Sequence, residues 1–124
     1  VGGSVVDTAS STVSGVVKGV SEVGGDVIEA VSGGTQGVVK GVSDTGGDVG
    51  KAAVGAVEGA IKAAGDVGAD TAEAAKSAVG GALRAATDVG GDAVGVVRDA
   101  LLSAASLPRD VIEAAIRGSE DKKD

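Results

Sequence analysis

The sequence predicts an all-α protein: long amphipathic helices with 11- and 22-residue repeats, packed as a bundle or a right-handed helical assembly through a Val/Ala/Gly stripe. Three observations predict this fold. The repeat has a period close to the helical turn, each repeat separates apolar from charged residues, and the side chains are small. A sustained period of 11 residues produces right-handed supercoiling when several helices associate.

The repeat is visible as an identical seven-residue segment that occurs twice. Gly15–Ser21 recurs without change as Gly37–Ser43, a shift of 22 residues. Each 22-residue unit divides into two of 11, and these units follow one another from Val5 without insertion or deletion. The same shift aligns two further series, the basic residues Lys18, Lys40, Lys62 and Arg84 and the aspartates Asp26, Asp48, Asp70 and Asp92.

Apolar and charged residues fall on opposite arcs of the predicted helix. The first position of the 11-residue unit is apolar in every unit but one, as is the second, and the third position is mostly charged. At about 98° per residue, the apolar positions form one contiguous arc. The charged arc predicts ion pairs between residues four apart, each stabilising by a few tenths of a kcal/mol. These pairs are Lys18–Glu22, Lys40–Asp44, Lys62–Asp66 and Arg84–Asp88.

The composition indicates a chain whose helices need something to pack against. Phe, Tyr, Trp, Met, Cys and His are absent, Gly occurs 23 times, and the apolar share of 43% is mostly Val and Ala. Burying a Val contributes roughly 1.5 kcal/mol, whereas ordering a residue costs about 1–2 kcal/mol. A lone helix of this composition is therefore expected to be unstable.

Composition also excludes several function classes. Without Cys or His the chain lacks thiol chemistry, imidazole catalysis and the usual zinc ligands. A net charge of −7 argues against nucleic acid as a partner. No motif completes a phosphate loop or a calcium site. We expect no enzymatic activity, no cofactor, no metal and no small-molecule substrate. The sequence shows neither a transmembrane segment nor a signal peptide, and the cellular location stays unknown.

Glycine inside a helix costs close to 1 kcal/mol relative to Ala, so its abundance needs an explanation. Close helix packing is one explanation, because small residues spaced four apart allow two backbones to approach. Breaks between shorter helices are another, and a β-solenoid is a third, less consistent with the Ala-rich residues 51–105. The close-packing candidates are Gly15, Gly19, Gly37, Gly41, Gly55 and Gly59, and the candidate breaks are the Gly-Gly pairs at 24–25, 33–34, 46–47, 80–81 and 90–91.

The chain divides into four predicted segments: an N-terminal end (1–4), the repeat region (5–105), a short helix (106–118) and a charged tail (119–124). Pro108 ends the repeat pattern, because proline lacks the N–H that a helix interior needs. The short helix restarts there and stops at Gly118. Residues 100–117 are the most hydrophobic part, either an anchor to a partner or a terminal capping helix.

The residues Gly15–Val20 and the 11-residue frame around them resemble the repeats of synucleins. The composition also resembles the repeat region of perilipins and, more loosely, apolipoproteins and late-embryogenesis proteins. The resemblance implies a long amphipathic helix lying on a vesicle or a lipid droplet. The Gly-Gly pairs and the acidic balance of this chain depart from that pattern.

Two functions follow as expectations. The first is a non-enzymatic scaffold that self-associates as a homo-oligomer through the small-residue apolar face, and the alternative is a coat on a lipid surface. A hydrophilic stress-protection protein is the third reading, ranked last because the mean hydropathy of +0.27 is high for that class. The face predicted to mediate either contact comprises Val16, Val17, Val20, Val27, Val38, Val39, Val42, Ile61, Leu83, Val94, Leu101, Ile112 and Ile116.

Overall fold

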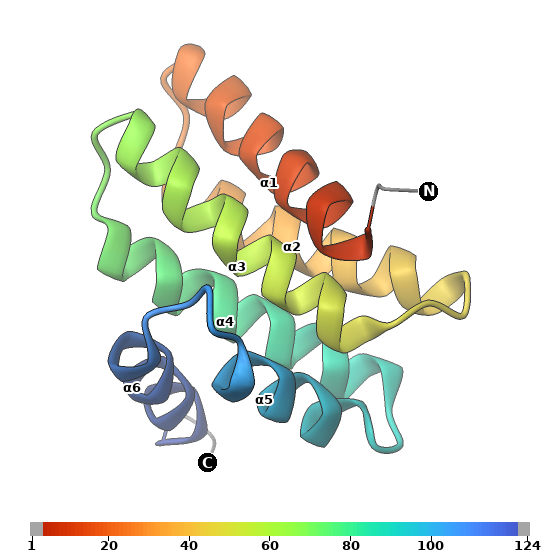
Figure 1. The fold of residues 1–124 in the computed structure, drawn as a ribbon. Helices are drawn as coiled ribbons and strands as arrows, with labels where there is room; N and C mark the ends of the chain where they lie inside the picture. Colours follow the sequence, from red (N-terminus) through yellow and green to blue (C-terminus); the bar gives the residue numbers. More distant parts are fainter. Residues whose placement is uncertain (1–3, 122–124) are drawn as a thin grey trace.

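A computed structural model describes residues 4–121, and this part of the chain is built from six α-helices with no strand (Figure 1). The all-α prediction is confirmed, and the β-solenoid does not occur over these residues. The helices are α1 (Val5–Glu22), α2 (Val27–Asp44), α3 (Val49–Asp66), α4 (Thr71–Val89), α5 (Ala93–Ser103) and α6 (Arg109–Asp121).

Successive helices form three stacked hairpins, α1–α2, α3–α4 and α5–α6 (Figure 1). Helix α1 packs on α3, and α3 packs on α5, while α2, α4 and α6 stack in the same way in a second layer. The α3–α4 hairpin therefore lies in the middle, with α1–α2 covering one side and α5–α6 the other.

The first five helices begin 22 residues apart, at Val5, Val27, Val49, Thr71 and Ala93. The residue before each of the first four helices is a Ser or an Asp. Its side chain accepts hydrogen bonds from backbone N–H groups of the first turn. For example, the Asp26 carboxylate accepts from the Glu29 N–H at 3.1 Å. This capping satisfies donors that have no partner inside the helix, so the recurring Asp of the repeat sets the helix start.

The ends of α1, α2, α3 and α4 are each set by the first glycine of the connection that follows the helix. Gly24, Gly46, Gly68 and Gly90 have φ between 75° and 87°, a left-handed conformation that suits glycine. The Gly25 N–H then donates to the Val20 carbonyl at 2.8 Å and the Gly24 N–H to the Ser21 carbonyl at 3.1 Å, a Schellman motif.

The Gly-Gly pairs therefore serve two purposes. Pairs 24–25, 46–47 and 90–91 lie between helices, whereas 33–34 lies inside α2 and 80–81 inside α4. The connections limit the helices to between 11 and 19 residues. The very long uninterrupted helix that the 11-residue period alone would allow is not formed.

The C-terminal helix begins and ends three residues later than the predicted short helix (106–118). Helix α5 ends at Ser103, and α6 begins at Arg109, directly after Pro108. It passes through Gly118, the predicted stop, and continues to Asp121. Of the predicted tail (119–124), residues 122–124 lie outside the described part of the chain, as do residues 1–3 of the predicted N-terminal end.

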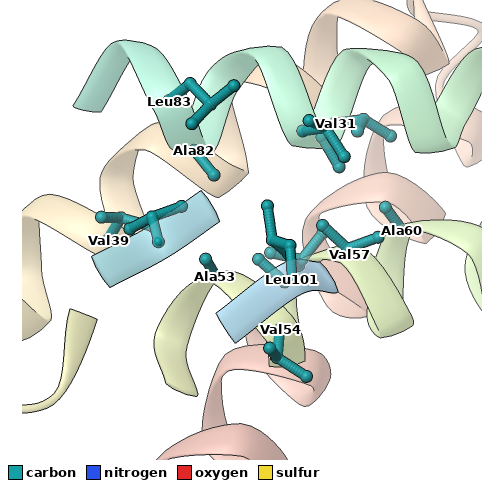
Figure 2. Packing of buried hydrophobic residues seen from close by; sticks show 14 of the residues in the cluster. Val31, Val39, Ala53, Val54, Val57, Ala60, Ala82, Leu83 and Leu101 are labelled. Carbon is teal, nitrogen blue, oxygen red and sulfur yellow. The ribbon is translucent and has the colours of Figure 1, made fainter. Parts of the chain in front are cut away.

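Small residues form the core where the hairpins meet (Figure 2). Val31 and Val39 of α2 pack into the same cluster as Ala53 and Val57 of α3, and Leu101 enters it from α5. Helix α3 buries residues around most of its circumference, as expected for a helix covered on both sides. Alanine and glycine at those positions let the three hairpins approach closely.

Candidate functional site

An open groove runs between α1 and α2, on the side of that hairpin facing away from the rest of the molecule. Its volume is about 610 Å³, and most of its lining is apolar. The lining residues are Val5, Thr8, Ala9, Thr12 and Val16 from α1, and Gly34, Gly37, Val38, Gly41, Val42 and Thr45 from α2.

The repeat explains why this groove is apolar although it is open. The opposite sides of α1 and α2 carry fully buried valines, including Val17 and Val39, which hold the hairpin on α3–α4. The outer side of α1–α2 is formed by the same repeat positions that are buried in α3–α4. One hairpin further on, the counterparts of Thr8, Thr12 and Val16 are alanines with no exposed surface, namely Ala52, Ala56 and Ala60. The same positions are thus covered in the middle hairpin and open in the first.

The predicted interaction face is divided by the fold. Of its members, Val16 is exposed at 39%, and it lines the groove together with the partly buried Val38 and Val42. Buried in the core are Val17, Val39, Leu83, Leu101, Ile112 and Ile116, and the remaining partly buried members are Val20, Val27, Ile61 and Val94. Most of the predicted face is therefore used for contacts within the chain.

The predicted close-packing glycines also separate into two groups. A Cβ at Gly55 would overlap the Val6 carbonyl oxygen, and one at Gly59 would overlap that of Ser10, so these two glycines allow α3 to touch the α1 backbone. A Cβ built on Gly15, Gly19, Gly37 or Gly41 would have no atom of a neighbouring side chain or helix within 4 Å, so these four positions face open space in the described structure. Gly37 and Gly41 line the groove instead.

Sequence reasoning missed the packing or groove-lining roles of three glycines and of several groove residues, among them Thr8 and Thr12. Gly81 lies against the α2 backbone, where an added Cβ would be 2.9 Å from the Ser32 carbonyl oxygen. Gly50 meets the Ala100 side chain in the same way, and Gly34, Thr8 and Thr12 line the groove. A signal existed for Gly81: the 22-residue shift aligns it with Gly15, Gly37 and Gly59, so one repeat position holds glycine four times.

Two of the described ion pairs join different hairpins. Lys18 Nζ lies 3.2 Å from Asp66 Oδ2, and Lys40 Nζ lies 2.8 Å from Asp88 Oδ2. The sequence predicted pairs with Glu22 and Asp44 in the lysines' own helices, but the lysines reach the next hairpin instead. All four side chains are about half exposed, so each pair contributes little to stability.

A second hollow, of about 490 Å³, lies between α2, α4 and α6. Charged side chains, including Glu73, Lys76 and Arg84, line it beside Ile28 and Ala115. It is more polar than the first groove, and the repeat gives it no counterpart.

The hydrophobic segment 100–117 lies against the rest of the molecule. Leu101, Leu107, Ile112 and Ile116 are at most 6% exposed. Their burial favours a capping role over an exposed anchor.

Residues 4–121 hold no group of three or more His, Cys, Asp or Glu arranged to bind a metal ion. None of their helices has both the length and the apolar character needed to cross a membrane. In comparisons with family models, with curated proteins and with solved structures, the chain matches none.

Proposed function

We propose that this chain is a non-enzymatic structural protein, a scaffold that self-associates through the small-residue apolar face of its first hairpin. The observation that carries the proposal is the open groove between α1 and α2, whose counterpart positions in α3–α4 are covered. Contact with a further protein surface would remove the exposed Val16 side chain from water. The 11-residue period favours a right-handed twist in such an assembly.

The glycines of this hairpin support the same proposal. Gly15, Gly19, Gly37 and Gly41 lie in helix interiors, where an added Cβ would meet no neighbouring side chain or helix within 4 Å. Each costs its helix close to 1 kcal/mol relative to Ala. In α3 the cost is offset because Gly55 and Gly59 allow close packing, and association would offset it for α1 and α2.

Sedimentation of the purified protein over a wide concentration range tests the proposal. We expect the wild type to form larger species as its concentration rises. Gly37→Glu, which puts a charge in the groove, should return it to the monomer. Gly95→Glu is the matched control, since Gly95 is another exposed helical glycine with open space around it and adds the same charge elsewhere. A wild type that stays monomeric throughout contradicts self-association.

A lipid coat is the second candidate, favoured by the apolar lining of the same groove and by the exposed Val16 and Val23. The burial of Leu101, Leu107, Ile112 and Ile116 argues against it, since the most hydrophobic segment is then withheld from lipid. Flotation with neutral phosphatidylcholine vesicles separates the two candidates. Binding to vesicles by a protein that remains monomeric without them would replace the scaffold proposal with the coat.

A further inference from the structure

One contact pattern joins the first hairpin to the second. In the α1–α3 layer, the carbonyls of Val6 and Ser10 lie against Gly55 and Gly59, residues 49 positions further along the chain. In the α2–α4 layer, the Ile28 carbonyl accepts a hydrogen bond from Ser77 Oγ at 2.9 Å, and the Ser32 carbonyl lies against Gly81. The separation is again 49 residues. Both layers therefore use the same register between a hairpin and the next.

The first hairpin carries the same small residues on its open side. Two repeats before Gly55, Gly59, Ser77 and Gly81, the counterparts are Ser11, Gly15, Gly33 and Gly37. All four are exposed, and no atom lies within 4 Å of a Cβ built on the three glycines. These four small positions of the surface that α3–α4 offers to α1–α2 thus recur as small residues at the end of the stack, where the described structure places nothing on them.

The acidic residues that form ion pairs between the first two hairpins also have counterparts in α1–α2. Lys18 and Lys40 of the first hairpin pair with Asp66 and Asp88 of the second. Two repeats before these aspartates stand Glu22 and Asp44. They are placed to receive two cations from a hairpin docked in the register that α1–α2 adopts on α3–α4.

The contact between α1–α2 and α3–α4 has two different sides, and this difference indicates which surface would fit the outer face of α1–α2. A hairpin offers valines on one side (Val13, Val17, Val31 and Val39, all fully buried) and small residues on the other. Two α1–α2 faces placed together would bring only groove valines such as Val16, Val38 and Val42 between them, and none of these four buried valines. The α5–α6 end of a second copy lacks them as well, because its counterparts of Val17, Val31 and Lys18 are Ala105, Ser119 and Ser106.

We propose that the outer face of α1–α2 is a docking site for a further helical hairpin of this 22-residue repeat, supplied from outside the 124 residues. Its valines would enter the groove, and its two basic residues would face Glu22 and Asp44. The inference rests on the proposed function only in taking α1–α2 as the interacting face, since it requires no association of identical copies.

An in-phase extension of the full chain tests this inference. Residues 5–48 are duplicated directly before Val5, which supplies one added hairpin in the register of the others. The chain has no cysteine, so Thr12→Cys introduces a single thiol into the groove of the original first hairpin. We expect this thiol to react with a thiol reagent at least tenfold more slowly in the extended chain than in the 124-residue chain.

A glycine substitution gives a second readout whose sign should reverse. Gly37→Leu meets open space in the 124-residue chain, so it should leave the urea midpoint unchanged or raise it, because leucine is the better helix former. In the extended chain, the same substitution at the original Gly37 should lower the midpoint and restore rapid thiol labelling.

Three outcomes would overturn the inference: equal labelling rates in the two chains, a Gly37→Leu effect of the same sign in both, or an added hairpin that stays unfolded on an otherwise folded protein. Wild-type self-association is measured separately by sedimentation, so a monomeric wild type with a protected thiol would refute the scaffold of identical copies and leave the docking site standing.

Discussion

The first and second hairpins are built from the same repeat but differ in what covers them. In α3–α4, contacts on both sides leave room mainly for alanine and glycine, and Ala56, Ala60, Ala82 and Ala86 have no exposed surface. In α1–α2, only one side is covered, and the counterparts on the other are Thr12, Val16, Val38 and Val42. Burial on two sides therefore restricts side-chain size more than the repeat itself does.

Glycine shows the same difference at a single repeat position. Gly15 and Gly59 are aligned by the repeat, yet a Cβ at Gly59 would overlap the Ser10 carbonyl, while one at Gly15 would meet nothing. The residue type alone does not say which glycine is required for packing. Substitutions in matched pairs can measure how far the two hairpins differ.

The largest expected effect comes from alanine at these two glycines. Gly59→Ala should lower the free energy of unfolding by about 3 kcal/mol, because α1 would have to move away from α3. Gly15→Ala should raise it by up to about 1 kcal/mol, through helix propensity alone. Urea unfolding followed by circular dichroism measures both, since the chain has no Trp or Tyr for fluorescence. Equal losses at the two sites would show that Gly15 is also in contact.

A smaller effect is expected where the first hairpin breaks the apolar pattern of the second. Thr35 is fully buried, and its hydroxyl has no hydrogen-bond partner among the described residues. Its counterparts Val13, Val57 and Val79 are all buried valines. An unsatisfied buried hydroxyl costs roughly 1–3 kcal/mol, so Thr35→Val should stabilise by about 1 kcal/mol. Val57→Thr is the reciprocal variant and should destabilise. A destabilised Thr35→Val protein would indicate that the hydroxyl has a partner after all.

The smallest effect concerns the ion pairs that link the two hairpins. A double-mutant cycle with Lys18→Met and Asp66→Asn should give a coupling energy of about 0.2–1 kcal/mol, because both side chains are about half exposed. High salt should reduce this coupling. Lys18→Met with Glu22→Gln is the comparison within α1. A stronger coupling there would favour the pair within one helix that the sequence predicted.

Much of the fold was readable from the sequence, because helix phase and repeat length are local properties. Considered only as pairs, the Gly-Gly sequences did not indicate which of them lie between helices and which lie inside one. Those that separate helices are followed by an aspartate, as in Gly24-Gly25-Asp26, whereas Gly33-Gly34 is followed by Thr35. That aspartate is the next helix's N-cap in all three connections, and in two of them its side chain accepts a hydrogen bond from the first turn, so capping chemistry separates them.

The contacts of the candidate site were harder to predict, because they depend on which side of each helix meets which neighbour. The pattern assigns Val16 and Val17 to one apolar face, yet Val17 is fully buried while Val16 lines the open groove. Likewise, Lys18 lies four residues from Glu22 but pairs with Asp66. Such choices follow from how the hairpins stack, and a repeat leaves them equivalent.

The identical segments Gly15–Ser21 and Gly37–Ser43 have a consequence for folding kinetics. A chain with two identical helical segments has more than one way to pair them during refolding, and misplaced pairings act as kinetic traps. The larger side chains of α5 and α6, among them Leu101 and Ile112, are not shared with α1 and α2 and distinguish these helices from the first two. We expect a slow refolding phase that disappears when one of the two segments is made distinct. The regularity that would allow a further hairpin to be added would then also make the chain slow to find its own register.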